Sequence, residues 1–123
     1  MQPLNVVLLQ SDSGMAQFLI APLCNFFRSV REARSFSDLR ASVAKHRVEV
    51  VILDLEMASI PDVEGLCHDF PGIHIVCNHR VADEGMWAAI LNAGAADCYP
   101  SHDTRGILTA ALRNAPTAHS LAA

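Results

Sequence analysis

The sequence lacks the features of several large classes of protein. Its first apolar run, between Asn5 and Gln10, is four residues long, which is too short for a secretory signal or a membrane span. No C-x-x-C pair occurs among the cysteines, so the spacing supports neither a zinc site nor a disulfide framework. We therefore expect a cytoplasmic protein whose cysteines are buried free thiols, namely Cys24, Cys67, Cys77 and Cys98.

Positive charge is also scarce. Nine Lys and Arg residues stand against thirteen Asp and Glu, which gives a net charge of −4 and a pI near 5.8. This balance argues against nucleic acid or an anionic membrane as a partner of this domain. No G-x-G-x-x-G or Walker pattern is present, so a nucleotide-binding loop is not indicated.

What the chain does contain is apolar material in alternating patterns. Half of its 123 residues are hydrophobic (51%), enough for one domain with a real core. Apolar runs of strand type alternate with segments of helical spacing. The predicted strands are 4–9, 30–35, 48–53, 73–77 and 96–99, and the predicted helices start near 13, 37, 62, 83 and 103. We predict a domain over residues 1–113 and a tail or the start of a linker over residues 114–123.

This alternation predicts an α/β protein with a five-stranded parallel sheet and helices on both faces. We expect the flavodoxin-like, doubly wound (βα)₅ arrangement with strand order 2-1-3-4-5, whose sites lie beyond the carboxyl ends of the strands. The first helix should be capped by Asp12 or Ser13 and kinked by Pro22. Its spacing indicates inward-facing side chains at Met15, Phe18, Leu19, Leu23, Phe26 and Phe27. Trp87 shares the period of core residues in a later helix, so we predict its burial.

The segment VVILDLEM, Val50 to Met57, ends a buried strand on a carboxylate, Asp54. In the predicted strand order, this residue faces Gln10, Ser11 and Asp12 across a crevice. A carboxylate there would be accessible to solvent yet held on a rigid strand, as a phosphoryl acceptor or a metal ligand must be. Asp54 could equally do no more than end the strand and turn the chain.

VVILDLEM, followed by Gly65-Leu66 and by GAADCY at Gly94 to Tyr99, resembles the receiver domains of two-component response regulators. VREARSFSDL, Val30 to Leu39, is similar to the second strand and helix start of the DNA-binding regulators of that family. The resemblance extends from Leu4 to about Arg113. It implies that Asp54 accepts a phosphoryl group from a sensor histidine kinase. It also implies an acidic pair after the first strand that helps to hold Mg²⁺, a hydroxyl after the fourth strand and a lysine after the fifth.

The chain departs from the family pattern at each of these places. Gln10 and Ser11 stand where the acidic pair should be, and only Asp12, one position on, is acidic. Asp54, Asp12 and the backbone carbonyl of Glu56 could form a weak Mg²⁺ site, although a helix cap is the preferred interpretation of Asp12.

The remaining two positions carry neutral or titratable side chains. The hydroxyl position falls on His79, or on Asn78 if the loop is one residue longer. The lysine position falls on Ser101, or on Tyr99 in the other alignment, and the only lysine in the chain is Lys45, far from both. Arg80 or Arg105 could supply charge from a neighbouring loop.

The sequence leaves three functions open. The first is an atypical receiver that accepts phosphate on Asp54 through an incomplete site. The second is a pseudo-receiver that docks a signalling protein, or forms a homodimer through its last helices, without phosphate. The third is a flavodoxin-like cofactor-binding domain, which the missing phosphate loop disfavours. We expect that the chain is not an enzyme, beyond self-phosphorylation and dephosphorylation at Asp54.

Overall fold

The structure of the protein is a computed structural model, which describes residues 4–113. Five strands alternate with five helices along these residues. In chain order the elements are β1 (Asn5–Leu9), α1 (Ser13–Leu23), β2 (Ser29–Glu32), α2 (Phe36–His46), β3 (Val50–Asp54), α3 (Ile60–Asp69), β4 (His74–His79), α4 (Glu84–Asn92), β5 (Asp97–Pro100) and α5 (Thr104–Arg113). The predicted tail, residues 114–123, lies outside the described residues.

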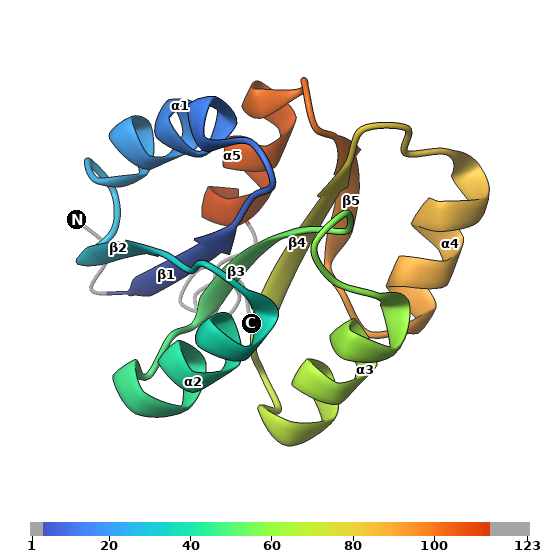
Figure 1. Ribbon diagram of the computed structural model, residues 1–123, viewed down its shortest axis with the longest axis horizontal. Coiled ribbons are helices and arrows are strands. Elements are labelled where there is room, and N and C mark those ends of the chain that lie inside the picture. The colour runs from blue at the N-terminus through green and yellow to red at the C-terminus, as the bar shows by residue number, and fades with distance from the viewer. Residues whose placement is uncertain (1–3, 114–123) are drawn as a thin grey trace.

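The strands form one parallel sheet in the order β2-β1-β3-β4-β5, as predicted (Figure 1). All five residues of the central strand β3 are buried, which explains why Val50 to Leu53 read as an uninterrupted apolar run. Register pairs Leu9 with Leu53 and Asp54 with Asn78. The carboxyl ends of β1, β3 and β4 therefore meet at one edge of the sheet.

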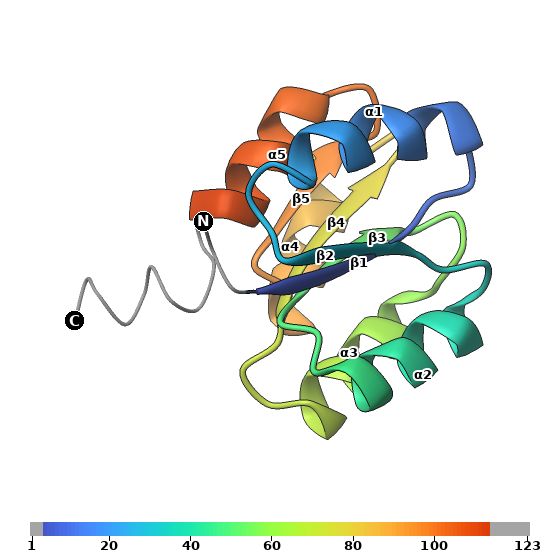
Figure 2. The same ribbon diagram turned by 90° about the vertical axis from the view of Figure 1, so that its left-hand side faces the viewer.

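Helices cover both faces of the sheet. In Figure 2, α1 and α5 lie above it and α2 and α3 lie below it. Side chains from α1 and α5 pack on Val6, Leu8 and Ile52, whereas α2, α3 and α4 pack on the opposite face of the same strands. Because side chains alternate along a strand, each inner strand supplies both cores.

The first helix is shorter and less buried than predicted. Asp12 is its N-cap, with Oδ1 accepting from the Gly14 amide (2.9 Å), and the helix ends at Leu23, one residue after Pro22. Only its Ala16, Leu19 and Leu23 are buried. The expected burial of Phe18 and Phe26 is wrong, since they are 74% and 47% exposed. Neighbouring residues on a helix point about 100° apart, so Phe18 turns away from the face that carries Leu19.

Other element boundaries shift by one to three residues. Ser59, not Asp62, caps α3: the Ser59 hydroxyl accepts from the Asp62 amide, and the Asp62 carboxylate accepts from the Ser59 amide. This reciprocal pair is a capping box, in which the acidic residue stands three positions inside the helix. β4 runs to His79, two residues beyond the prediction, because Asn78 and His79 still pair with β5.

The predicted burial of Trp87 is also wrong. Trp87 is 47% exposed, and Ile90 is the buried residue of α4. α4 packs beside the edge strand β5, where the Trp87 indole donates to Asp97 Oδ1 (3.1 Å). The indole N–H thus has a hydrogen-bond partner, while part of the apolar ring remains in contact with solvent.

The cysteines are free, and two of them are buried. Burial, with a smaller contribution from Asp97, raises the pKa of Cys98 to about 11, and burial raises the pKa of Cys77 as well. These thiols are therefore protonated and unreactive near neutral pH. Cys24, in contrast, is exposed at the end of α1, where burial was expected. Within residues 4–113, no helix combines the length and the apolarity that crossing a membrane requires.

Candidate functional site

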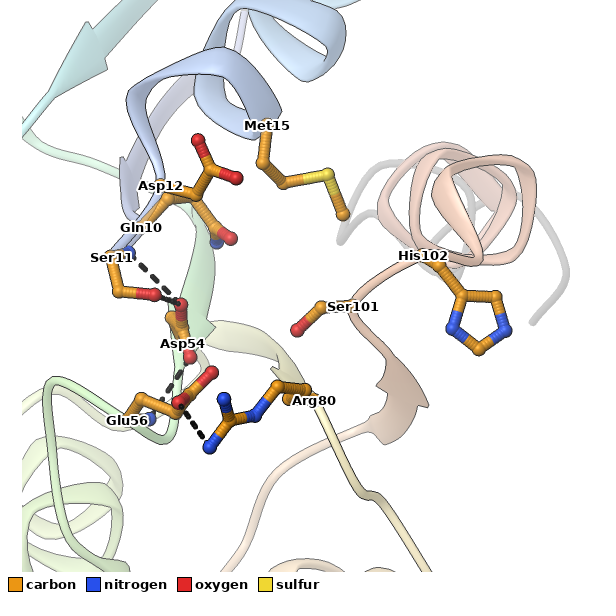
Figure 3. A pocket seen from close by; sticks show the side chains of 9 residues that line it. All are labelled: Gln10, Ser11, Asp12, Met15, Asp54, Glu56, Arg80, Ser101 and His102. Atoms are coloured by element: carbon orange, nitrogen blue, oxygen red, sulfur yellow. Dashed lines mark hydrogen bonds and ion pairs between the residues drawn. The ribbon is translucent and has the colours of Figure 1, made fainter.

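A cavity of about 460 Å³ opens at the carboxyl edge of the sheet, in front of Asp54 (Figure 3). Parallel sheets with this strand order hold their sites at this edge, between the first and third strands. The cavity is lined by Gln10, Ser11, Asp12, Met15, Asp54, Glu56, Arg80, Ser101 and His102. The structure thus brings together Asp54, Asp12, Glu56 and Ser101, four of the five residues predicted for the site.

Three hydrogen bonds from the chain hold the carboxylate of Asp54. Its Oδ2 accepts from the Ser11 amide (2.9 Å) and the Ser11 hydroxyl (2.7 Å), and its Oδ1 accepts from the Glu56 amide (2.9 Å). Asp54 is only 2% exposed, so the expectation of a solvent-accessible carboxylate is wrong. Its immediate partners are nevertheless polar groups rather than the apolar core.

A neutral network lies beside this carboxylate. Gln10 Nε2 donates to Asn78 Oδ1 (2.9 Å), and Asn78 Nδ2 donates to Gln10 Oε1 (3.1 Å) and to Ser101 Oγ (2.9 Å). Gln10 and Asn78 are buried, and buried amides need such partners. The network ties β1, β4 and the end of β5 together without adding a charge.

Neither residue considered for the hydroxyl position lines the cavity, but Asn78 bonds to Gln10 and Ser101, which do. Asn78 is the register partner of Asp54 on the neighbouring strand. His79 is not among the residues that line the cavity, and its Nδ1 accepts from the Val81 amide (3.0 Å). Ser101, considered for the lysine position, lines the cavity and lies across it from Ser11 (Figure 3).

The acidic groups expected to hold Mg²⁺ have partners within the chain. Both oxygens of Asp54 accept hydrogen bonds from the chain, and Asp12 caps α1. The Glu56 side chain lies 3.6 Å from the Arg80 guanidinium. Within residues 4–113, no group of three His, Cys, Asp or Glu side chains is placed to hold a metal. Mg²⁺ takes near-octahedral oxygen ligands, usually one or two carboxylates together with waters and phosphate oxygens.

Some lining residues were not singled out by the sequence. Met15 was expected only as a core residue, and His102 carried no signal. Arg80 was one of two arginines considered as a source of charge, and it does line the cavity, whereas Arg105 does not. The Arg80 side chain is 76% exposed, so its charge remains well hydrated. It lies within 4 Å of Glu56 but not of Asp54, so it offsets the charge of Glu56 more than that of Asp54.

This arrangement fixes the orientation of the Asp54 carboxylate but supplies little that would make it a better nucleophile. The three hydrogen bonds fill three of the roughly four acceptor positions of the carboxylate and leave one on Oδ1. No lysine or arginine lies within ion-pair distance of Asp54 in the described part of the chain. The site therefore has room in front of Asp54 but little positive charge in its lining.

No protein-family model matches the sequence, and no curated protein matches it either. Solved structures, in contrast, match well. The N-terminal signal receiver domain of a two-component response regulator from Bacteroides fragilis has a TM-score of 0.80 at 19% identity, with 91% of this chain and 96% of that one covered. A two-component response regulator from Clostridium difficile has a TM-score of 0.72 at 14% identity, with 90% and 97% covered.

A third neighbour carries the modification that the resemblance suggests. It is a response regulator from Burkholderia pseudomallei with a phosphorylated aspartic acid, a calcium ion and citrate, at a TM-score of 0.76 and 18% identity, with 98% of this chain and 73% of that one covered. Identities this low carry information about the fold only. The chain has the fold of the receiver domains of two-component response regulators.

Proposed function

We propose that the chain is an atypical receiver domain in signal transduction that acts by docking to another protein, without needing phosphate at Asp54. The observation that carries the proposal is the set of three hydrogen bonds from Ser11 and Glu56 to the Asp54 carboxylate. A group that its own chain satisfies so fully serves as an anchor between the ends of β1 and β3. In this proposal the domain is not an enzyme.

The charge balance of the cavity supports the same interpretation. Phosphoryl transfer depends on positioning and on neutralising the transferred group, and the residues beside Asp54 are mostly neutral. Loss of one preorganised donor or cation from such a site slows a reaction by roughly 10²–10³. Because Gln10, Ser11 and Ser101 replace three charged groups of the family pattern, transfer to Asp54 should be very slow.

The second candidate is a receiver that still accepts phosphate on Asp54. The cavity of about 460 Å³ in front of this residue favours it, because a phosphoryl group would fit there with Arg80 at the rim. The phosphorylated neighbour from Burkholderia pseudomallei supports it by analogy. Its donor would be a sensor histidine kinase, whereas the first candidate needs only a signalling protein or a second copy docked on the last helices.

Exposure to acetyl phosphate separates the two candidates. We expect no phosphate-sized increase in the intact mass of the protein after incubation with acetyl phosphate and Mg²⁺, because Asp54 lacks both a metal site and a neighbouring cation. Intact-protein mass spectrometry makes the measurement, with Asp54→Asn as the control. A mass increase in the wild-type protein that Asp54→Asn abolishes would overturn the first candidate and support the second.

The anchoring role of Asp54 predicts a loss of stability on its replacement. An Asn side chain has a single acceptor oxygen, so its amide group must face at least one donor from Ser11 or Glu56. Leaving such a donor unsatisfied and removing charge-assisted hydrogen bonds should lower the free energy of unfolding by about 2 kcal/mol. The midpoint of urea unfolding, followed by circular dichroism, measures the effect.

Ser11→Ala is the matched control, since it removes only the hydroxyl donor and keeps the amide donor. We expect it to lower the free energy of unfolding by about 1 kcal/mol. Equal or greater stability of Asp54→Asn relative to the wild type would contradict the anchor, because a carboxylate kept for chemistry is commonly destabilising.

A further inference from the structure

A second surface lies at the opposite edge of the sheet from Asp54. A groove of about 720 Å³ runs past the start of β1 and the ends of α2 and α3. Arg28 and Arg47 lie on its walls, and Val48, Phe70 and Ile73 give it an apolar lining. The Asp54 site and this groove share no residue, so a ligand can occupy the groove whatever the role of Asp54.

The charges are unevenly distributed along the chain, and the segment richest in basic residues supplies two that line this groove, Arg28 and Arg47. Six of the nine basic residues but only two of the thirteen acidic ones fall within residues 28–47, a net charge of +4 in a protein whose total is −4. This segment comprises the loop before β2, the edge strand β2 and helix α2. The basic residues of the segment are Arg28, Arg31, Arg34, Arg40, Lys45 and Arg47.

The groove is lined by two arginines, Arg28 and Arg47, and by two carboxylates, Glu49 and Asp69. Among residues 4–113, neither Arg28 nor Arg47 has an ion-pair partner within 4 Å. Glu49 accepts from the Asn5 amide (2.8 Å), and Asp69 forms an ion pair with Arg40. The groove therefore presents unpaired guanidinium groups next to apolar side chains.

The positive charge continues onto the neighbouring surface. The pKa of His46 is lowered, first by partial desolvation and then by the charges of Arg31, on β2, and Lys45, near the end of α2. Both charges therefore stand close to His46. Basic residues in the last turn of a helix complement its dipole, which accounts for Lys45 and His46. Arg28 and Arg31 lie outside any helix, and no helix end accounts for them.

Arg47 also adopts a conformation that arginine avoids. Its φ is +53°, in the left-handed region, and it follows the last residue of α2. Glycine or asparagine usually occupies this place after a helix. An arginine kept here in spite of the strain is consistent with a use for its side chain.

We propose that this groove binds an acidic segment of a partner protein that also carries apolar side chains. The partner's carboxylates pair with Arg28 and Arg47, which offer bidentate geometry, and its apolar side chains pack against Phe70 and Ile73. Nucleic acid and anionic membranes are poorer partners because the rest of the chain carries a net charge of −8 and repels extended polyanions.

The test uses a fluorescein-labelled peptide of alternating Glu and Leu and measures its anisotropy with increasing protein. Binding should weaken as salt is added, and it should be lost when Gln replaces Glu or Ser replaces Leu in the peptide. Arg28→Glu should weaken binding about tenfold or more. Arg105→Glu, the same exchange at an exposed position of α5, should leave the affinity unchanged.

Arg47→Gly keeps the test valid if a charge reversal impairs folding. Glycine tolerates the left-handed conformation, so this variant should melt at the same or a higher temperature while it binds the peptide several-fold more weakly. Absence of peptide binding, or an equal loss in Arg105→Glu, would overturn the proposal. So would tighter binding of duplex DNA or phosphatidylserine vesicles through Arg28, or salt-sensitive self-association of the chain that the same substitutions abolish.

Discussion

The double variant Ser11→Asp, Ser101→Lys is expected to accept a phosphoryl group on Asp54 from acetyl phosphate at least 10²–10³ times faster than the wild-type chain. Ser101 lines the cavity, so a lysine there directs its ammonium group toward the space in front of Asp54. The Ser11 hydroxyl lies 2.7 Å from Asp54 Oδ2, and a carboxylate in its place would share a cation with Asp54. The intact mass, followed over time in Mg²⁺, measures the rate.

Two controls separate this effect from a general change of charge. The same double variant combined with Asp54→Asn should gain no mass. Thr109→Lys, which adds an ammonium group at an exposed position of α5, should leave the rate unchanged. If the double variant is phosphorylated as slowly as the wild type, the neutral side chains at positions 11 and 101 are not what limits the rate of phosphoryl transfer to Asp54.

Mg²⁺ gives the double variant a second, non-kinetic readout. Two carboxylates at positions 11 and 54 repel each other, so the variant should melt at a lower temperature than the wild type in the absence of divalent ions. A cation bound only by the folded state restores stability by mass action. We expect the melting temperature of the double variant, but not that of the wild type, to rise with Mg²⁺.

The fold was largely predictable from the sequence because burial leaves a direct pattern. A strand covered on both faces, such as Val50–Asp54, must be apolar throughout, and the alternation of strands and helices leaves few topologies. Helix faces were harder to predict. Phe18 and Trp87 follow an apolar period, but the period does not say how much of a helix circumference the sheet covers. α4, beside an edge strand, buries only Ile90.

The position of the site was predictable, but its internal chemistry was not. Asp54 follows a buried strand, which places it at the carboxyl edge in any parallel sheet. The pairing of Gln10 with Asn78 joins residues 68 positions apart and depends on strand register, to which a single sequence gives no access. The three donors that sequester Asp54 include two backbone amides, and backbone groups leave no trace in the residue pattern.

A large loss of stability from one added methyl group is expected at Gly94, in the connection from α4 to β5. Its φ is +110°, which side chains other than hydrogen rarely allow, and a Cβ there would lie 2.8 Å from Cys67 Sγ and 3.0 Å from Cys67 Cβ. Gly94→Ala therefore combines backbone strain with a clash. We expect a decrease of about 3 kcal/mol in the free energy of unfolding, measured from the urea midpoint.

Two other glycines of the chain separate these contributions. Gly72 has a φ of +88° but open space around its missing Cβ, so Gly72→Ala carries the strain alone and should lose about 1 kcal/mol. Gly65 lies inside α3 with nothing within 4 Å, so Gly65→Ala should gain roughly 0.5–1 kcal/mol from helix propensity. Cys67→Ala should recover part of the loss in Gly94→Ala by removing Sγ, while the strain remains. Equal effects at Gly94 and Gly72 would mean that α3 moves away from Gly94 at no cost, contrary to the close packing of Cys67 against this turn.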